Sequence, residues 1–318
     1  MIPIDDIRLA AERIRPHVVR TPLLAVPQLA PGYAGLRLKC ESMQRAGSFK
    51  ARGALNRVLT LTAEERRRGL CTVSAGNHAA AVAWAARVAG CSAVVVMPDS
   101  APQPKIDAVR AEGAEIVFHA DRATLFDRLR EVQAERGATF VHPFDDPVVL
   151  AGAGTAGLEI ADDVPDVHTV VVPVGGGGLL GGVASAVKAL RPAARVVAVE
   201  LEAGPGLAPA LAAGKPVPAP RPPTLADGMT PPFVGALPLE IAREAVDEIV
   251  NVTEEEIVEG MRRLVSRARL VAEGAGAAAT GAILAGKVHV PDGAVVVALL
   301  SGGNVDPQKL AGVLAGSR

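Results

Sequence analysis

Short apolar runs rich in β-branched residues alternate along this chain with alanine-rich stretches long enough to form helices. Strands that are apolar throughout are buried on both faces, which is typical of a mostly parallel sheet covered by helices. The pattern therefore predicts an α/β fold. We expect strands at 36–40, 71–74, 92–98, 114–119, 168–174, 194–200 and 293–300, and helices at 77–90, 103–113, after 174 up to about 190, and at 254–270.

The proline-rich stretch 212–232 interrupts this alternation, and we expect a long loop there. The chain has 318 residues, of which 49% are hydrophobic, so it can bury a sizeable core and is long enough for two domains. No short-period repeat or low-complexity tract divides it further.

Composition argues against several classes of partner. Lys and Arg total 33 against 34 for Asp and Glu, so no basic excess points to nucleic acid or to an anionic membrane. Aromatic residues make up only 3%, too few for platforms that stack single strands. The N-terminal segment is charged and amphipathic, unlike a signal peptide, and no apolar run is long enough to span a bilayer.

The cysteines indicate a reducing environment. Cys40, Cys71 and Cys91 are odd in number and form no C-x-x-C pair. A disulfide framework is therefore not expected, and we predict a cytoplasmic protein.

Four consecutive glycines, Gly175, Gly176, Gly177 and Gly178, separate a predicted strand from a predicted helix. We call these residues the glycine loop. Backbone N–H groups there can surround an anion, and the following helix N-terminus adds partial positive charge, so a phosphate is the expected guest. The alternative is a tight turn, for which one or two glycines suffice.

A dinucleotide is a rival guest for the glycine loop. Gly176, Gly178 and Gly181 fit the G-x-G-x-x-G fingerprint, and Glu200 ends the next strand, where an acid would meet a ribose hydroxyl. However, the stretch GAGTAG at 152–157 fits the same pattern, so the pattern is weak in a chain this rich in glycine. An NAD-binding oxidoreductase therefore remains an alternative function.

Lys50 lies in the motif AGSFKARGA, beside Phe49. A lysine amine is nucleophilic only when unprotonated, and burial beside an aromatic ring lowers its pKa. An aldehyde cofactor that carries a phosphate, pyridoxal 5′-phosphate, would use both this lysine and the glycine loop. Taken alone, Lys50 fits a solvated surface charge better than a catalytic group.

A second constellation is SAGNH, in which Ser74, Ala75, Gly76, Asn77 and His78 form a strand-to-helix turn. We call these residues the carboxylate loop, because free N–H groups at such a turn can hold a substrate carboxylate. The Asn77 amide can also bind a cofactor hydroxyl, although Asn or Ser before a helix is an ordinary N-cap as well. Ser301, in the turn SGGN, can face a heterocycle nitrogen or serve ordinary turn chemistry.

The order of these motifs along the chain resembles that of the fold-type II pyridoxal-phosphate enzymes, and in particular the threonine/serine dehydratase and serine racemase branch. The resemblance extends from about Ile4 to Asp306. It rests on KCESMQRAGSFKARGALNRV, SAGNH, MPDSAPQPKIDAVRAEGAEIV, VHPFDDP, AGAGTAGLEI, VPVGGGGLLGG, TLADGM, AEGAGA and LLSGGNVD.

The resemblance implies a role for each matching residue. Lys50 matches the catalytic Schiff-base lysine and Phe49 the aromatic packed on the cofactor ring. Asn77 matches the asparagine at the ring hydroxyl, and Ser301 the serine that faces the ring nitrogen. The glycine loop matches the phosphate cup and the carboxylate loop the substrate site. Since serine is a neutral partner for the ring, β-elimination is favoured over transamination.

Two departures from the pattern matter. Where serine racemases carry a second serine that acts as a base on the face opposite the lysine, this chain has Ala75, so racemisation is disfavoured. The divalent-metal site of racemase-type members would include Glu200, but the later carboxylate position is Gly206. A hard cation needs several oxygen ligands, so we expect no metal site.

The resemblance implies two domains similar to those of tryptophan synthase β, a large one at 1–68 plus 147–318 and a small substrate-closing one at 69–146. It also implies a homodimer, a small amino-acid substrate and, because the chain ends soon after Asp306, no C-terminal regulatory domain. Met229, Phe144 and Ala153 are candidates for lining the side-chain pocket. We expect β-elimination of L-threonine or L-serine to a 2-oxo acid and ammonia. Alternatives are a 3-hydroxyaspartate, phenylserine or ectoine-pathway substrate, a serine racemase, and a non-catalytic sensor.

Overall fold

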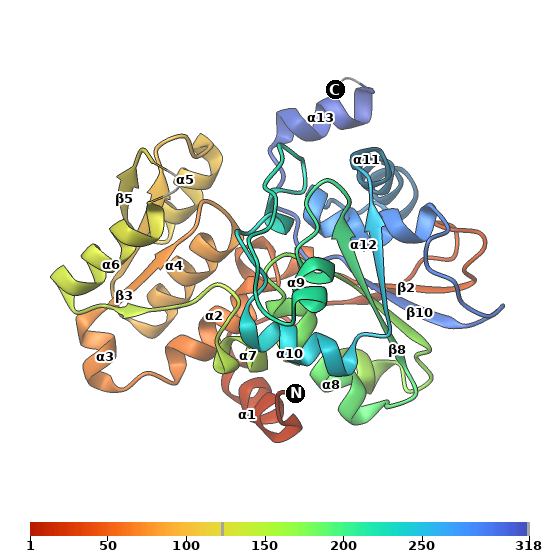
Figure 1. Ribbon diagram of the computed structural model, residues 1–318, viewed down its shortest axis with the longest axis horizontal. Helices are drawn as coiled ribbons and strands as arrows, with labels where there is room; N and C mark the ends of the chain where they lie inside the picture. The colour runs from red at the N-terminus through yellow and green to blue at the C-terminus, as the bar shows by residue number, and fades with distance from the viewer. Residues whose placement is uncertain (122–123, 317–318) are drawn as a thin grey trace.

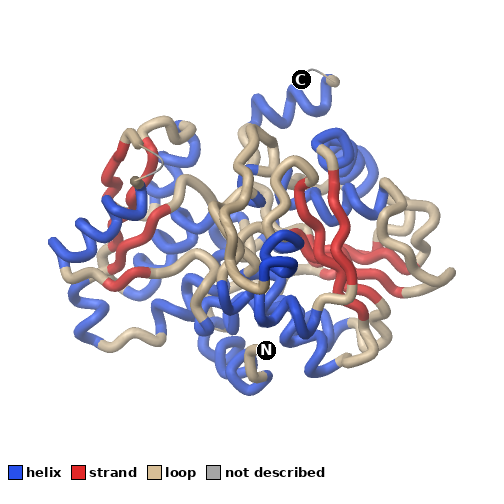
Figure 2. Tube along the Cα trace, in the orientation of Figure 1, coloured by secondary structure: helices blue, strands red, loops and turns tan. Residues whose placement is uncertain are grey.

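The computed structural model describes residues 1–121 and 124–316 and contains two separate sheets (Figures 1 and 2). The larger sheet has the strand order β1-β2-β10-β7-β8-β9, in which only the β1–β2 pair is antiparallel. Its strands are β1 (Leu23–Ala25), β2 (Gly35–Lys39), β7 (Thr169–Pro173), β8 (Arg195–Leu201), β9 (Glu248–Val252) and β10 (Val295–Leu299).

The smaller sheet is entirely parallel, with the order β5-β4-β3-β6. It lies on the left of Figure 1. Its strands are β3 (Leu70–Val73), β4 (Ala93–Pro98), β5 (Glu115–His119) and β6 (Thr139–Phe140). Every strand expected from the sequence is present within two residues of its expected bounds, and the predicted α/β class is confirmed. The short strands β1, β6 and β9 were not expected. The division into domains at 68/69 and 146/147 stays a prediction.

Helices pack on both sheets. They are α1 (Ile4–Ile14), α2 (Lys50–Leu59), α3 (Ala63–Arg68), α4 (Asn77–Ala89), α5 (Gln103–Ala111), α6 (Leu125–Arg136), α7 (Pro147–Asp163), α8 (Gly178–Leu190), α9 (Leu207–Ala213), α10 (Ala236–Ala245), α11 (Glu254–Arg263), α12 (Gly274–Leu284) and α13 (Pro307–Ala315). None of the helices within residues 1–121 and 124–316 is both long and apolar enough to cross a membrane.

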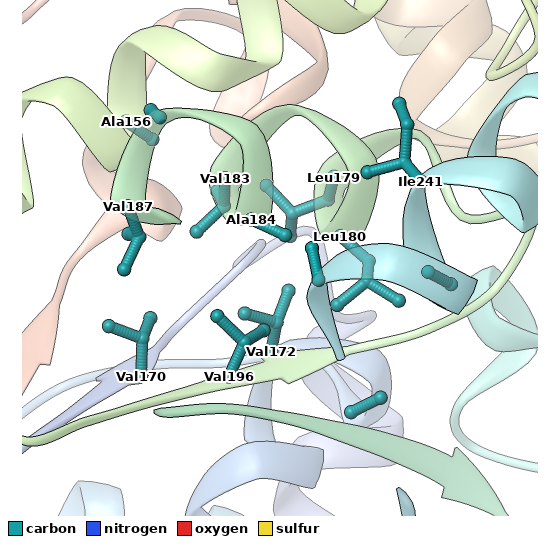
Figure 3. Packing of buried hydrophobic residues seen from close by; sticks show 14 of the residues in the cluster. Ala156, Val170, Val172, Leu179, Leu180, Val183, Ala184, Val187, Val196 and Ile241 are labelled. Carbon is teal, nitrogen blue, oxygen red and sulfur yellow. The ribbon is translucent and has the colours of Figure 1, made fainter. Parts of the chain in front are cut away.

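Alternate side chains of the central strands enter two different core layers, as the period of a strand requires. Val170 and Val172 of β7 pack with Val183 and Val187 of α8, on the face seen in Figure 3. Val171, between them, belongs to the layer that contains α11 and α12. Both faces of the larger sheet are therefore buried, which accounts for the uninterrupted apolar strands of the sequence.

The GAGTAG stretch is helical and not a loop, because it lies inside α7. A Cβ built on Gly154 would lie 2.9 Å from the carbonyl oxygen of Gly182 in α8, and one built on Gly182 would lie 2.5 Å from the backbone nitrogen of Gly154. These glycines let the two helix backbones approach closely. Their match to the dinucleotide pattern is therefore explained by packing.

The helix expected at 254–270 is shorter than predicted. α11 begins at Glu254, as predicted, with a capping box of Thr253 and Glu256, but it ends at Arg263. A wider π turn follows at Leu264–Ala268, and Arg269 then adopts a left-handed backbone angle (φ 61°) that ends the helix. As expected, the proline-rich stretch forms neither helix nor strand over the described residues 214–226, between α9 and the 3₁₀ turn η3 (Asp227–Met229).

Candidate active site

Lys50 is the first residue of α2, and the turn that precedes it is held against the end of β10. Phe49 donates its backbone N–H to the carbonyl of Ser301 at 3.0 Å. The side-chain amide of Asn304 donates to the carbonyl of Ala46, 258 residues away in sequence, at 2.8 Å. The lysine motif and the SGGN turn, both singled out in the sequence, are therefore in direct contact.

Two lysines, Lys39 at the end of β2 and Lys50 at the start of α2, differ in burial and in hydrogen-bond partners. Lys39 is fully buried and forms an ion pair with Glu159 at 2.5 Å. Lys50 is partly buried, and its Nζ donates a 2.6 Å hydrogen bond to the carbonyl oxygen of Pro143 and lies 5.1 Å from the centre of the Phe49 ring. A carbonyl carries no net charge, so burial dominates and lowers the pKa of Lys50 to about 8. Lys50 is thus the lysine able to present a free amine near neutral pH.

The glycine loop connects β7 to the N-terminus of α8, where backbone N–H groups have no partner within the helix. A Cβ on Gly176 would lie 2.3 Å from the ring of Phe144, and one on Gly175 would lie 2.7 Å from the carbonyl of Gly228. Gly177 has a left-handed backbone angle (φ 88°). Side chains are therefore excluded at these positions, which keeps backbone amides accessible to an anion.

The carboxylate loop follows β3 and leads into α4. The hydroxyl of Ser74 accepts a hydrogen bond from the N–H of Gly76 at 3.1 Å, and Gly76 is the N-cap residue of α4. His78 is buried, and its Nε2 bonds to the carbonyl of Val141 at 3.0 Å. Burial and the nearby Lys50 amine lower the pKa of His78 to about 3, so this imidazole is neutral and donates from Nε2.

Asn77 is held from two sides. Its Nδ2 donates to a carboxylate oxygen of Glu273 at 2.5 Å, and its Oδ1 accepts from Nδ2 of Asn304 at 2.7 Å. Ser301, which is 5% exposed, donates to the carbonyl of Ala275 across a long 3.4 Å. A Cβ on Gly302, the residue after Ser301, would lie 3.1 Å from Nδ2 of Asn77, so Asn77 lies against the SGGN turn although the two follow strands of different sheets.

Glu273 is a buried carboxyl that the sequence analysis did not single out, although it lies in the motif AEGAGA. Burial raises its pKa to about 7, opposed by the hydrogen bond from Asn77. Asp227 raises the pKa further, whereas Lys105 lowers it. Lys105 and Asp227 themselves form an ion pair that joins α5 to η3. Glu273 therefore changes charge close to physiological pH.

The carboxylate of Glu200 accepts hydrogen bonds from nearby backbone N–H groups. One carboxylate oxygen accepts from the N–H groups of Gly206 at 2.7 Å and Leu207 at 2.5 Å, and the other accepts from Ala208 at 3.0 Å. Glu200 thus caps the start of α9, which weakens its case as a ribose ligand. In the part of the chain that the structure describes, no group of three or more His, Cys, Asp or Glu side chains is arranged to hold a metal ion.

Hydrogen bonds and packing contacts link the predicted site residues into one region. Pro143, which bonds to Lys50, precedes Phe144, which packs against the glycine loop, and Val141 contacts the carboxylate loop. These residues fit the three functional groups of pyridoxal phosphate. The amine with a lowered pKa fits the aldehyde, and the crowded glycine turn at a helix N-terminus fits the phosphate. The buried neutral serine fits the ring nitrogen. His142, Glu273 and Asn304 also belong to this region and were not predicted.

The fold and the site together define the class, a fold-type II pyridoxal-phosphate protein. Residues 14–302 match the profile of the family described as "Pyridoxal-phosphate dependent enzyme". The chain belongs to this family, as its motif order indicated.

The chain is similar over nearly its whole length to proteins named threonine ammonia-lyase or threonine dehydratase. The chain is 44% identical over 311 residues to an L-threonine ammonia-lyase of Thermotoga maritima, covering 96% of this chain and 76% of that one. It is 41% identical over 321 residues to an L-threonine dehydratase (catabolic TdcB) of Staphylococcus aureus, covering 99% and 92%. The first relative is longer than this chain.

Solved structures agree with the fold. A threonine deaminase from the organism abbreviated T.th. superposes with a TM-score of 0.89 at 42% identity and covers 95% of this chain and 98% of that one. A maize serine racemase superposes with a TM-score of 0.92 at 36% identity, covering 98% and 97%. The fold is therefore common to dehydratases and racemases, and site residues must distinguish between them.

Proposed function

We propose that this protein is a pyridoxal-phosphate-dependent ammonia-lyase that converts L-threonine, and also L-serine, to a 2-oxo acid and ammonia. The observation that carries the proposal is the Lys50 amine, which has a lowered pKa and a neutral hydrogen-bond partner, Pro143, whose neighbour Phe144 packs against the glycine loop. Relatives named threonine ammonia-lyase or dehydratase at 41% and 44% identity support this substrate class.

In this proposal Lys50 and the glycine loop hold the cofactor. The bound cofactor supplies an electron-withdrawing ring that makes the α-proton of the substrate acidic. The free Lys50 amine would accept that proton at Nζ, which the Pro143 carbonyl orients. Ser301 and Asn77 position the ring, and Phe49 packs beside it.

The carboxylate loop orients the substrate. Backbone N–H groups at the N-terminus of α4 bind its carboxylate, and the helix dipole favours this negative charge. His78 is neutral, because its pKa is about 3, so it adds no positive charge and the carboxylate is bound by the backbone N–H groups. Ser74 stabilises the loop through its bond to Gly76.

A racemase is the alternative that shares this fold. Racemisation needs a proton donor or acceptor on each face of the α-carbon, and the alanine methyl of Ala75 can serve as neither. We therefore assign elimination and not racemisation to this chain. The distinguishing measurement is the configuration of residual serine after partial turnover, which stays L in this proposal.

The direct test is a visible absorbance spectrum of the purified protein supplied with pyridoxal phosphate, titrated with L-threonine or L-serine and coupled to detection of 2-oxo acids. We expect a band that shifts when substrate is added, together with oxo-acid release. A shift without product would overturn the substrate assignment and point to another β-hydroxy amino acid, such as a 3-hydroxyaspartate. No band would overturn the assignment of Lys50 and favour the dinucleotide alternative.

The proposal includes a cytoplasmic homodimer. All three cysteines are free thiols, which supports a reducing compartment. Light scattering of the purified protein tests the oligomeric state, and a monomer that retains full activity would contradict the dimer.

A further inference from the structure

Residues 141–146 link β6 of the smaller sheet to α7, and nearly every one of them contacts the candidate site. The carbonyl of Val141 bonds to His78, and the carbonyl of Pro143 accepts from Lys50. The ring of Phe144 packs against Gly176. The carboxylate of Asp145 accepts from the N–H groups of Ala236 and Leu237 at the start of α10, and that of Asp146 caps α7. The shape of this segment therefore sets the geometry around Lys50.

The side chain of His142 folds this segment into a turn. Its Nδ1 bonds to the backbone N–H of Phe144 at 3.2 Å and to that of Asp145 at 2.8 Å. Both partners are donors, so Nδ1 must carry a lone pair. The ring also packs edge-on against Phe140 and Phe144, with centroid distances of 5.4 Å and 4.8 Å.

We propose that His142 is a positioning residue, whose Nδ1 lone pair closes the 142–145 turn and thereby presents the Pro143 carbonyl to Lys50 and the Phe144 ring to the glycine loop. The inference rests on the proposed function of Lys50 and the glycine loop. His142 acts through its neighbours. Among the described residues, the structure shows no hydrogen bond from His142 to the Lys50 amine or to the glycine loop.

Protonation opens the turn, because a proton on Nδ1 would face two N–H donors. Burial and the positive charge of Lys50 disfavour the protonated ring, whereas Asp145 and Asp146 favour it, and the balance lowers the pKa of His142. His78 lies close enough to interact with His142, but its own pKa of about 3 keeps it neutral until strong acid. The turn is therefore closed at neutral pH and opens only on acidification.

The test compares two amides at position 142. His142→Asn places an acceptor oxygen near the position of Nδ1, whereas His142→Gln places it near Nε2. His289→Gln, at an exposed histidine, controls for the substitution itself. The readouts are hydrogen exchange of the backbone amides of residues 144–146 in the cofactor-loaded protein and the affinity of the apo protein for pyridoxal phosphate, measured by absorbance.

We expect H142N to remain within about threefold of the unaltered protein in both readouts. We expect H142Q to weaken cofactor affinity about tenfold or more and to speed exchange at Phe144 and Asp145 by a similar factor, since it loses two hydrogen bonds. Equal behaviour of H142N and H142Q would overturn the proposal, as would full protection of these amides in H142Q.

A second measurement uses the unaltered protein, so it does not depend on whether H142Q folds. In the unaltered protein, protection of the Phe144 and Asp145 amides from hydrogen exchange should fall in acid before global unfolding. In H142N these amides should stay protected at the same pH, because an amide oxygen does not titrate in this range. Protection that falls at the same pH in both proteins would refute the role of His142. Neither readout needs substrate turnover. A protein that fails to act on threonine would therefore overturn the proposed function, whereas the role of His142 would still be decided by these two measurements.

Discussion

The amine of Lys50 donates a 2.6 Å hydrogen bond to the carbonyl oxygen of Pro143, 93 residues further along the chain. This contact joins the first turn of α2 to the segment that leaves the smaller sheet. It gives the amine an oriented acceptor without a counter-charge, so nothing offsets the burial that lowers the pKa of Lys50 to about 8. Orientation and a free amine near neutral pH are the two properties that a nucleophilic lysine needs.

The pH dependence of cofactor loading follows from the pKa of Lys50, which burial lowers. Only the free amine reacts, so the rate at which apo protein takes up pyridoxal phosphate should rise about tenfold per pH unit below 8 and level off above it. Stopped-flow absorbance between pH 6 and about 10 measures this. A rate that keeps rising toward pH 10 would mean that Lys50 titrates like an ordinary lysine.

Substituting Gly176 by alanine should damage the glycine loop. The new Cβ would lie 2.3 Å from the Phe144 ring, and this ring is packed against Phe233 and His142. We expect cofactor affinity to fall about tenfold or more and stability to fall by about 1–3 kcal/mol from overpacking. Absorbance titration and thermal unfolding provide the two measurements.

Gly32→Ala is the matched control for Gly176→Ala, because a Cβ at Gly32 meets nothing within 4 Å. A further Phe144→Ala change in the Gly176→Ala background should recover part of the lost affinity by removing the clash. If Gly176→Ala and Gly32→Ala bind the cofactor equally well, the crowding of the glycine loop has no functional consequence.

Glu273→Gln should alter how stability depends on pH. Burial raises the pKa of Glu273 from 4.5 to about 7, so the folded state binds more protons than the unfolded state between these values. This contribution to the free energy of unfolding is present below pH 4.5 and is lost as the pH rises through 7. The variant, which keeps the acceptor for Asn77 but carries no charge, should be more stable than the unaltered apo protein at pH 8, by on the order of 2–3 kcal/mol.

Urea unfolding at pH 8 and at pH 4.5 checks this prediction. The difference between the two proteins should shrink toward zero at the lower pH, where Glu273 is largely protonated in the unaltered protein. An equal difference at both pH values would show that the substitution acts through packing and not through charge.

Arg52→Met should be strongly destabilising. The guanidinium of Arg52 is buried and bonds to both oxygens of Glu41 at 2.8 Å and to Glu159 at 2.8 and 2.9 Å. Methionine would leave the buried Glu41 without its main partner, at a cost of about 3–5 kcal/mol. Arg8→Ala, which removes an exposed ion pair with Asp5, should cost no more than about 1 kcal/mol. Urea unfolding that gives similar losses for both variants would contradict this account.

Local sequence patterns were sufficient to predict much of the fold, and they nominated the candidate site residues, whose roles stay a prediction. Apolar runs predicted the central strands, and the helix expected from residue 254 begins there. The glycine loop and the lysine motif are contiguous in sequence, so their chemistry was visible there.

What the sequence did not reveal depends on contacts between distant residues or on backbone geometry. Glu273 reaches Asn77 across 196 residues, and only the folded chain brings them together. The end of α11 depends on a left-handed angle at Arg269, a residue type that rarely adopts one. Glycine is unfavourable inside helices, so the three glycines of GAGTAG do not indicate one. The stretch is helical because α7 packs closely on α8 there.

The central claim is that Lys50 is the lysine that holds the cofactor. Borohydride reduction of the cofactor-loaded protein, followed by proteolysis and mass spectrometry, measures directly which lysine carries the cofactor. The account predicts that the label lies on the peptide containing Lys50 and that Lys39, paired with Glu159, carries none. A label on any other lysine, or a loaded protein without a covalent label, would contradict it.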